Sequence, residues 1–440
     1  MAKVSIRELV NGIIRSASLK ERTRIAAEKL RDQINDDYMV ISVGKASQEM
    51  LAGLIEGLGS RPSRGLVILP KGYRLYINAM YSNLSVIQSG HPIPDQESLD
   101  AGEAALNIAK SAGGLHKALV VLVSGGGSAL MEKPLPGVSL QDIATVNSLL
   151  LRSGASISEI NTVRRHLSQV KGGGLVKVSR GAEVYGIYAS DVPGDKLEDI
   201  ASGPTAPDPT TFSDALEVLR TYDIIDKVPT SVINALQDGL RGRLPETLKP
   251  GSPELDHVNN FIIAKNLDVL LYVKEALEKA GFNVMVLTSA MLGESREVGK
   301  LLASIAYESV HSGLPLRPPA AIIMGGETNV TVKGRGLGGR NQELALSWVI
   351  EAHRLGLGDE VHLLALATDG VDGPTNAAGA FVTPRHYDAI LKRSINPISA
   401  LNDNNSYAAL NASGGLIVTG PTGSNLNNVV VLIVGGDVED

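Results

Sequence analysis

YMVISVGKA, residues 38–46, is the stretch that decides the fold of this 440-residue chain. It begins with an apolar run rich in β-forming side chains, which ends at Gly44 and Lys45 before a helical pattern that extends towards residue 58. A strand that is apolar throughout is typical of a parallel sheet whose two faces are both covered. The stretch therefore predicts a central parallel strand followed at once by a helix.

Similar runs follow along the chain. Strands are expected at residues 65–69, 84–88, 118–123 and 183–189, and helices at 4–18, 21–34, 96–110, 140–151 and 157–170. Strands that alternate with helices indicate a parallel sheet with helices on both faces. Ligands of such sheets bind beyond the carboxyl ends of the strands, which gives weight to residues 44–45, 90–92, 124–128 and 190–195.

A second α/β series begins near residue 258. Its strands are expected at 261–264, 283–288, 320–324, 361–367 and 429–434, with helices ending near 280 and spanning 294–311 and 342–353. Between the two series, LPETLKPGSPE at 244–254 has the composition of a linker. We therefore predict an α/β protein of two domains, residues 1–245 and 246–440.

The composition excludes several classes of protein. A net charge of −6 argues against a nucleic-acid-binding protein, which needs surplus Lys and Arg to neutralise phosphates. The chain has no cysteine, which excludes disulfides and thiolate chemistry. The N-terminal residues do not resemble a signal peptide, and no window is long and apolar enough for a membrane span. A cytoplasmic protein that does not bind membranes is expected.

The stretch GGETNVTVKGRGLGGRNQE, residues 325–343, combines glycines and arginines between an expected strand and an expected helix. Backbone amides and cations at a helix N-terminus bind anions. The spacing of Gly334, Gly336 and Gly339 also matches G-x-G-x-x-G, which favours a rival interpretation as a nicotinamide-binding reductase. The acidic residue that should follow about 20 residues later is misplaced, because Asp369 comes too late.

SGGGSAL, residues 124–130, follows an expected strand and exposes amides that can approach a phosphate. A plain strand-to-helix turn would need only one glycine. Lys45 occupies a similar position, where an ammonium group can contact phosphoryl oxygens. A solvated surface lysine would occupy the same position equally well.

INTVRRHLSQVKGGG, residues 160–174, places Arg164, His166 and Lys171 near a probable helix end. Cations at a helix C-terminus stabilise the helix dipole and need no further role. An alternative is that one of these side chains binds a small carboxylate or phosphate, for which arginine has the matching geometry.

Two pairs of acidic residues follow expected strands: Asp191 with Asp195, and Asp369 with Asp372. Aspartate is common in such turns without any function. Phosphoryl transfer, however, needs carboxylates for Mg²⁺ and a base near the acceptor hydroxyl. The dispersed glycine loops and acids fit a nucleoside triphosphate and a small anionic acceptor better than a dinucleotide.

A set of motifs in this order closely resembles the glycerate 2-kinase family, whose C-terminal part is called the MOFRL domain. The motifs are VGKAS (43–47), SGGGSAL (124–130), INTVRRHLSQVKGGGL (160–175), SDVPGDKLEDIASGPT (190–205), GGETNVTV (325–332), GRGLGGRNQE (334–343), TDGVDGPTNAAGA (368–380) and TGPTGSNLNN (419–428). The resemblance implies ATP- and Mg²⁺-dependent phosphorylation of D-glycerate to 2-phosphoglycerate. It also implies a Rossmann-like N-terminal domain and a MOFRL domain, with the active site in the cleft between them.

The resemblance places the family's important lysine and arginine at Lys45 and Arg340. We expect Asp191 to orient or deprotonate the acceptor hydroxyl, and Glu327 and Asp369 to hold Mg²⁺. Phosphate-binding candidates are Ser124, Gly125, Gly126, Gly127, Ser128, Gly325, Gly326, Gly336, Gly339 and Thr368. Substrate-binding candidates are Arg164, His166, Lys171 and Asn341. A hydroxypyruvate reductase and a non-catalytic nucleotide sensor stay open as alternatives, as does a homodimer.

Overall fold

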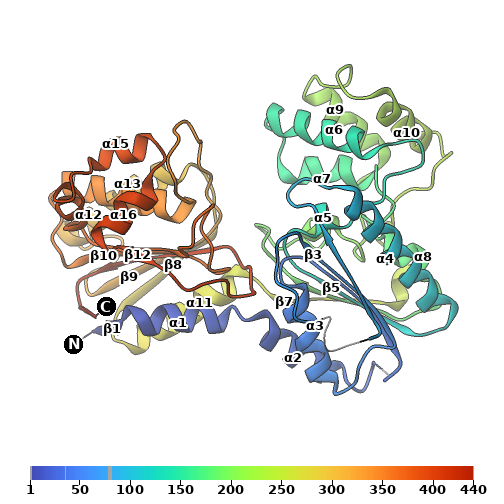
Figure 1. The fold of residues 1–440 in the computed structure, drawn as a ribbon, viewed down its shortest axis with the longest axis horizontal. Coiled ribbons are helices and arrows are strands. Elements are labelled where there is room, and N and C mark those ends of the chain that lie inside the picture. The colour runs from blue at the N-terminus through green and yellow to red at the C-terminus, as the bar shows by residue number, and fades with distance from the viewer. Residues whose placement is uncertain (1, 35, 78–81, 440) are drawn as a thin grey trace. The chain divides into compact units, whose positions relative to one another are not determined.

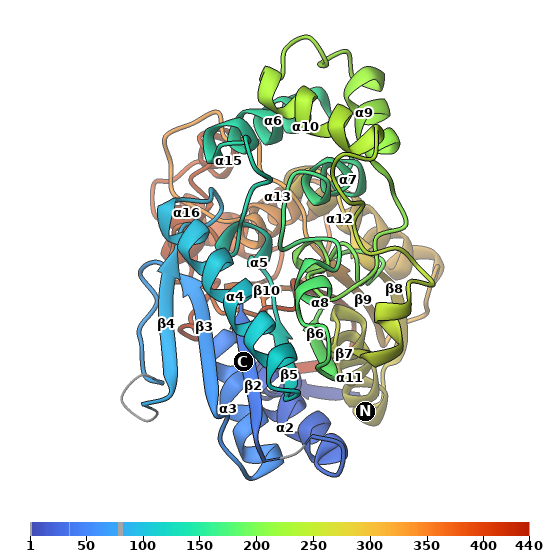
Figure 2. The same ribbon diagram turned by 90° about the vertical axis from the view of Figure 1, so that its right-hand side faces the viewer.

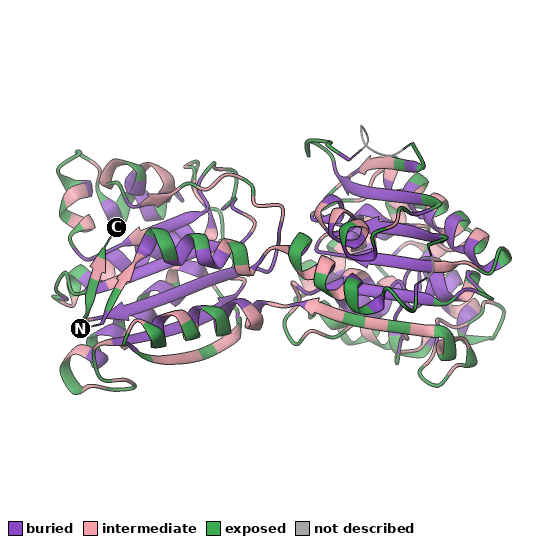
Figure 3. Cartoon of the chain, turned by 90° about the horizontal axis from the view of Figure 1, so that it is seen from below, coloured by how far each residue is buried: buried purple, intermediate pink, exposed green. Residues whose placement is uncertain are grey.

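The computed structural model describes residues 2–34, 36–77 and 82–439, which form two compact units (Figure 1). The continuous unit is Leu19–Ala264, and the discontinuous unit combines Met1–Ser18 with Lys265–Asp440. In both units the buried residues are concentrated in the strands (Figure 3). Among the described residues no helix has the length and apolarity that a membrane span needs.

The continuous unit is built on a sheet of six parallel strands in the order β4-β3-β2-β5-β6-β7. The chain moves outward from β2 to β4 and then returns to β5 on the other side of β2, so the strand order reverses between β2 and β5. This doubly wound arrangement confirms the predicted parallel sheet. The strands are β2 (Tyr38–Val43), β3 (Arg64–Pro70), β4 (Leu84–Ser89), β5 (Ala118–Val123), β6 (Val184–Ala189) and β7 (Val258–Ala264).

Helices cover both faces of this sheet (Figure 2). α4 and α8 pack on one face around Ile41, Val121 and Ala105, and α3 packs on the other with α2 against it. Four further helices, α6, α7, α9 and α10, have an apolar core of their own. The helices are α2 (Leu19–Leu30), α3 (Ser47–Leu58), α4 (Gln96–Gly114), α5 (Gly127–Leu130), α6 (Leu140–Ser153), α7 (Ile157–Arg165), α8 (Gly174–Val178), α9 (Phe212–Thr221) and α10 (Thr230–Leu240), with 3-10 turns at Ile200–Ser202 and Pro253–His257.

The discontinuous unit contains a mixed sheet in the order β12-β11-β10-β13-β9-β8. Only β8 and β9 run parallel, and every other neighbouring pair is antiparallel. A separate pair joins β1 to β14, near the two ends of the chain. The strands are β1 (Lys3–Ser5), β8 (Asn283–Met291), β9 (Ala320–Gly326), β10 (Val361–Ala367), β11 (Gly379–Val382), β12 (Leu416–Ile417), β13 (Asn428–Val434) and β14 (Asp437–Glu439).

The helices of this unit also lie on both faces of its sheet. α12 and α13 pack on one face, where Trp348 is fully buried. α11 packs on the other face, and α1 lies beside it. The helices are α1 (Ile6–Ser16), α11 (Asn266–Lys279), α12 (Ser295–Ser312), α13 (Arg340–Arg354), α14 (His386–Leu391), α15 (Pro397–Asn402) and α16 (Ser406–Ser413).

The two units divide the chain differently from the predicted domains 1–245 and 246–440. Residues 258–264, expected to open the second domain, form β7 and pair with β6 of the continuous unit. The linker-like stretch at 244–254 is therefore a loop inside that unit. Residues 1–18 belong to the other unit, because the apolar side of α1 is buried there and β1 pairs with β14.

Candidate active site

Two loops meet where the strand order reverses between β2 and β5. The Lys45 amide donates to the Gly125 carbonyl at 2.9 Å. The Ala46 amide donates to Ser124 Oγ at 3.2 Å. Gly44 has a φ of 125°, and a Cβ at this position would lie 2.2 Å from Ser124 Oγ, so the contact requires glycine. The end of β2 and the glycine loop 124–128 are thus fixed against each other.

The amides of residues 125–128 have no hydrogen-bond acceptor in the part of the chain that the structure describes. Ser124 differs from them, because its amide donates to the Val43 carbonyl at 3.0 Å and its side chain is fully buried. Successive unpaired amides at a strand end form a concave site for anions. Of the predicted phosphate-binding residues 124–128, residues 125–128 thus have unpaired amides, whereas Ser124 is bonded to β2.

A strained turn lies against this glycine loop. Ala201 and Ser202 have φ angles of 51° and 58°, in the left-handed region that non-glycine residues avoid. The hydroxyls of Ser202 and Ser128 are 2.9 Å apart. Ser202 Oγ also donates to Asn161 Oδ1 at 3.2 Å, and Asn161 Nδ2 donates to Asp199 Oδ1 at 3.1 Å. These hydrogen bonds connect α7 to the start of α5.

Three ionisable side chains follow strands of the same sheet: Lys45 after β2, His91 after β4 and Asp191 after β6. Burial raises the pKa of Asp191, and the nearby Lys45 ammonium opposes that rise. Burial lowers the pKa of His91, and the charge of Lys45 lowers it further. The predicted pair Lys45 and Asp191 is thus brought together by the fold.

His91 was not predicted as a site residue. Its ring lies against the glycine loop, since a Cβ on Gly126 would be 2.9 Å from His91 Cδ2. The only signal in the sequence was its position directly after an expected strand. The contact between His91 and the glycine loop could not be predicted, because the two are far apart in the sequence.

Two of the predicted substrate-binding side chains have carboxylate partners within the continuous unit. The helix expected over 157–170 ends at Arg165 as α7, and His166 follows it. His166 Nε2 lies 3.2 Å from Glu246 Oε2, and Lys171 Nζ lies 2.5 Å from Glu132 Oε2. Burial lowers the pKa of Lys171, whereas Glu132 opposes that decrease. Both side chains therefore have a partner already, and Lys171 and Glu132 form a fully buried pair, whereas Glu246 is partly exposed.

Arg164 differs from these cations. Its Nε is buried and has no hydrogen-bonding partner among the described residues. Burial lowers the pKa of its guanidinium, and the charge of Glu132 opposes this effect. The adjacent Arg165 is paired with Asp199 at 3.2 Å and Asp208 at 3.0 Å. A buried guanidinium nitrogen without a hydrogen-bonding partner is unusual, and Arg165 Nε is a second case, although it lies 3.0 Å from Asp208 Oδ1.

In the discontinuous unit, the glycine stretch after β9 uses its amides internally. The amides of Lys333 and Gly334 donate to Asn404 Oδ1 at 2.8 and 2.9 Å, and that of Gly336 donates to the Asp403 carbonyl at 2.8 Å. A Cβ on Gly334 would lie 2.2 Å from the same carbonyl. Gly336 therefore does not offer its amide to a phosphate, and its glycine serves close packing against residues 403–405 instead.

The N-terminus of α13 is capped by Asp372. Its carboxylate accepts hydrogen bonds from the amides of Asn341 and Gln342 at 3.1 and 2.9 Å, and also from both side-chain amides. Burial raises the pKa of Asp372, and these hydrogen bonds oppose that rise. Asn341, a predicted substrate ligand, is buried in this network. Thr368 is also buried, and its hydroxyl bonds to residues 426–427.

Glu327, Asp369 and Arg340 lie at one edge of the mixed sheet. Glu327 follows β9 and Asp369 follows β10, and β13 begins between these strands at Asn428. Two strand spacings separate the strand ends by about 10 Å. The Arg340 guanidinium pairs with the Glu327 carboxylate. Within the described residues no three His, Cys, Asp or Glu side chains are grouped closely enough to hold a metal ion.

Two family models match the sequence. Residues 2–237 match a domain of unknown function, DUF4147, and residues 320–428 match the MOFRL family. A glycerate 2-kinase of Pyrococcus horikoshii is 42% identical over 403 residues, which cover 91% of this chain and 88% of that protein. A D-glycerate 2-kinase of Thermotoga maritima is 40% identical over 399 residues, 91% of each chain. A putative hydroxypyruvate reductase of Agrobacterium vitis is 35% identical over 435 residues, 98% of this chain and 95% of that protein.

Solved structures give the same result. The crystal structure of a glycerate kinase from Thermotoga maritima superimposes with a TM-score of 0.84 at 38% identity, and the match covers 97% of this chain and 98% of that chain. A crystal structure of a Pyrococcus horikoshii protein has a TM-score of 0.79 at 40% identity, with coverage of 99% and 100%.

Proposed function

This chain belongs to the glycerate kinase family, and we propose that it transfers the γ-phosphoryl group of ATP to the 2-hydroxyl of D-glycerate, giving 2-phosphoglycerate and ADP. The observation that carries this proposal is the anion site at the β2/β5 reversal, where unpaired amides of residues 125–128 lie beside Lys45. Ligands of doubly wound sheets bind at this point of the fold.

The glycine loop and Lys45 hold the phosphoryl oxygens in this proposal. Amides and an ammonium that are already fixed in place stabilise the charge of a transferring phosphoryl group without further reorganisation. The hydrogen bond between the Lys45 amide and Gly125 supports this role, because it keeps the cation and the loop in register.

Asp191 is the proposed group that orients or deprotonates the 2-hydroxyl. A general base is most effective when its pKa is raised towards the working pH, and burial has this effect on Asp191. Its proximity to Lys45 brings the acceptor hydroxyl close to the phosphoryl group that Lys45 holds. His91 is added as a neutral hydrogen-bonding group at the same loop, since burial lowers its pKa.

Arg164 is the proposed ligand of the glycerate carboxylate. Its buried Nε lacks a partner among the described residues, and a guanidinium can bind a carboxylate through two parallel hydrogen bonds. We no longer propose His166 and Lys171 as substrate ligands, because each side chain already has a carboxylate partner.

Glu327 and Asp369 remain the proposed magnesium ligands. Mg²⁺ in kinases is held by one or two carboxylates together with phosphate oxygens and water, and it neutralises charge on the phosphates. Two oxygen donors at one sheet edge fit this chemistry. Arg340 neutralises Glu327, and we propose that it moves to the phosphates when the nucleotide binds. These residues belong to the discontinuous unit.

The test is an assay coupled to enolase, which accepts 2-phosphoglycerate and not 3-phosphoglycerate. We expect ADP formation that requires D-glycerate and Mg²⁺, together with an enolase signal. Lys45→Ala should lower kcat by about 100-fold or more, because one preorganised cation is lost. Lys29→Ala is the matched control, since Lys29 is exposed on α2. Near-normal turnover of Lys45→Ala would remove Lys45 from the mechanism.

The reductase alternative is tested in the same samples by NADH and NADPH oxidation with hydroxypyruvate. The relative from Agrobacterium vitis bears the name of such an enzyme. The geometry gives it little support, because amides of the G-x-G-x-x-G stretch are used by residues 403–405. A cytoplasmic location and a homodimer stay predictions of the same proposal.

A further inference from the structure

A groove of about 930 Å³ lies in the discontinuous unit, between α1 and the edge strands β11 and β12. Its size is within the range of small-molecule binding sites. None of the proposed catalytic or substrate-binding residues lines it. The groove therefore needs an explanation of its own.

Part of the groove lining is apolar, and the rest is polar or charged. Ile6 and Val10 contribute from α1, Phe381 from β11, and Leu416 and Ile417 from β12. Phe381 is held in position by a stacked contact with His362, whose ring centroid lies 5.6 Å away. These side chains form a surface suited to the hydrocarbon or aromatic body of a ligand.

The charged residues in the lining of the groove are cationic. Arg7 on α1 and Arg385 before α14 are both exposed, and neither has an ionic or hydrogen-bonding partner among the described residues. Among the described residues no acidic side chain lines the groove, although the chain carries a net charge of −6. The lining is therefore positive in a protein whose total charge is negative, and it attracts anions.

His386 adds a directed hydrogen-bonding group. His386 Nδ1 lies 3.0 Å from the Thr383 amide nitrogen and 3.2 Å from the Thr383 carbonyl oxygen, so Thr383 engages this ring nitrogen in either tautomer. The Cδ2 edge of the ring faces Gly415, since a Cβ on Gly415 would lie 3.2 Å from it. Both residues line the groove.

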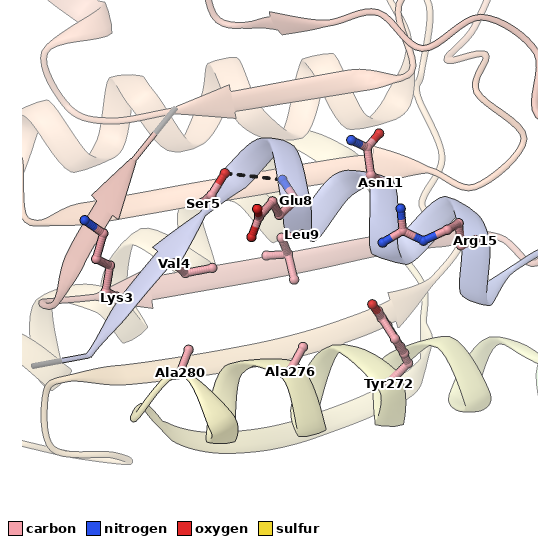
Figure 4. A pocket seen from close by; sticks show the side chains of 10 residues that line it. All are labelled: Lys3, Val4, Ser5, Glu8, Leu9, Asn11, Arg15, Tyr272, Ala276 and Ala280. Atoms are coloured by element: carbon pink, nitrogen blue, oxygen red, sulfur yellow. Dashed lines mark hydrogen bonds between the residues drawn. The ribbon is translucent and has the colours of Figure 1, made fainter.

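The opposite side of α1 provides an internal comparison. Figure 4 shows a smaller hollow of about 430 Å³ between α1 and α11. Its lining includes an acid, Glu8, and its Lys3 is paired with Glu439 at 2.5 Å. Mixed and paired charges do not select an anion there. The two linings thus differ in net charge, because the hollow is lined by Lys3, Arg15 and Glu8, whereas the described lining of the groove has two arginines and no acid.

We propose that the groove between α1 and β12 binds a small organic anion with an apolar body, of the class of aromatic carboxylates and sulfonates. The apolar walls accommodate the body, and Arg7 and Arg385 pair with the anionic group. The bound anion regulates the enzyme.

The proposal that the anion regulates the enzyme rests on the proposed function and on the chain segment that follows β12. The groove extends to Val418 and Thr419, from which the chain leads into the loop at Thr422. The Thr422 amide donates to the Asp369 carbonyl at 3.0 Å, and its hydroxyl donates to the Thr368 carbonyl at 2.6 Å. Residues 418–422 therefore connect the groove to the loop that carries Asp369, a proposed magnesium ligand.

The first experiment is a fluorescence titration of the full chain with anilinonaphthalene sulfonate, an aromatic anion. We expect one saturable site in the wild type. The double variant Arg7→Ala/Arg385→Ala should bind about tenfold more weakly, because two charge-assisted contacts are lost. Arg393→Ala is the matched control, as Arg393 is exposed and lies outside the groove. Phenylnaphthylamine, the neutral counterpart, should not distinguish the double variant from wild type.

Wild-type affinity in the double variant, or an equal loss in Arg393→Ala, overturns the site. An equal loss for the neutral probe overturns the role of charge. Both arginines are exposed, so the variants should melt at the wild-type temperature.

The second experiment measures glycerate kinase kinetics with the sulfonate at saturation. We expect kcat or KM to change at least about twofold in the wild type and not in the double variant. Unchanged kinetics would overturn the proposal that the anion regulates the enzyme, but not the proposal that the groove binds it. If no kinase activity is found, the proposed function fails, and the titration still decides whether the groove binds anions.

Discussion

Ala201 occupies a backbone conformation that glycine adopts with less strain. Its neighbour Ser202 is in the same region and bonds to Ser128 in the glycine loop. Strain of this kind persists where the surrounding structure imposes it, and it is concentrated at functional sites. We infer that the turn presses the glycine loop into its anion-binding shape.

The substitution Ala201→Gly tests this inference. Relief of the left-handed strain should raise the free energy of unfolding by up to about 1 kcal/mol, while the looser turn lowers kcat. Asp223→Gly is the matched control, because Asp223 has a φ of 52° on the surface away from the loop. Its stability should rise without any change in turnover. Equal turnover in both variants would show that the strain has no catalytic role.

Glu246 predicts a pH dependence of stability. Burial opposes its ionisation, but hydrogen bonds from His166, the Phe212 amide and Lys249 lower its pKa to about 2. A carboxyl with a lowered pKa in the folded state stabilises the protein above its ordinary pKa, and this stabilisation is lost as the pH falls towards about 2.

Melting temperatures measured between neutral pH and about 2 should therefore fall less steeply for Glu246→Gln than for the wild type. Asp238→Asn removes an exposed carboxylate that pairs with Arg243, and it serves as the control. The prediction is wrong if both variants follow the wild-type profile.

At the scale of the element, α13 depends on a cap supplied from a distant loop. Asp372 accepts hydrogen bonds from the first turn of this helix, which carries Arg340. Asp372→Ala leaves buried amides without acceptors and should lower the free energy of unfolding by about 2 kcal/mol or more. Ser139→Ala, which removes an exposed cap of α6, should cost about 1 kcal/mol or less. Denaturant unfolding of both variants provides the comparison.

The sequence predicted those strands in which nearly every residue is apolar and buried. β5 is apolar throughout, and β2 and β10 each contain a single polar residue, Ser42 and His362, and this pattern identified them. β12 and β14, with two and three residues, carry no readable period and were missed. Their formation depends on partner strands distant in sequence.

The same limit applies to the candidate site. The position of Lys45 and residues 125–128 after parallel strands was sufficient to predict their proximity. The structural role of Gly336 was not predictable, because Gly336 packs against residues 403–405, which are distant in sequence. For His166 and Lys171, the sequence showed the residue types but not Glu246 and Glu132, the acids with which they pair.

At the scale of the whole molecule, the continuous unit should fold alone. A fragment of residues 19–264 contains every strand of its sheet, whereas one of residues 19–245 lacks β7. Loss of β7 exposes the edge of β6 and removes Asn260, which bonds to Thr205. We expect a cooperative thermal transition and a monomeric elution for 19–264, and aggregation or a lower transition for 19–245. Equal behaviour would place the boundary nearer to the predicted residue 245.

The pairing of β1 with β14 has a consequence for biosynthesis. Lys3 pairs with Asp437, so β1 is synthesised before β14 and can form its pair only after β14 has been made. At about 5–20 residues per second, this interval lasts tens of seconds, long enough for the continuous unit to fold first. The nascent α1, with its apolar face uncovered, is a candidate for chaperone binding during that time. A circular permutant that joins the neighbouring ends and opens the chain between residues 18 and 19 would remove the delay.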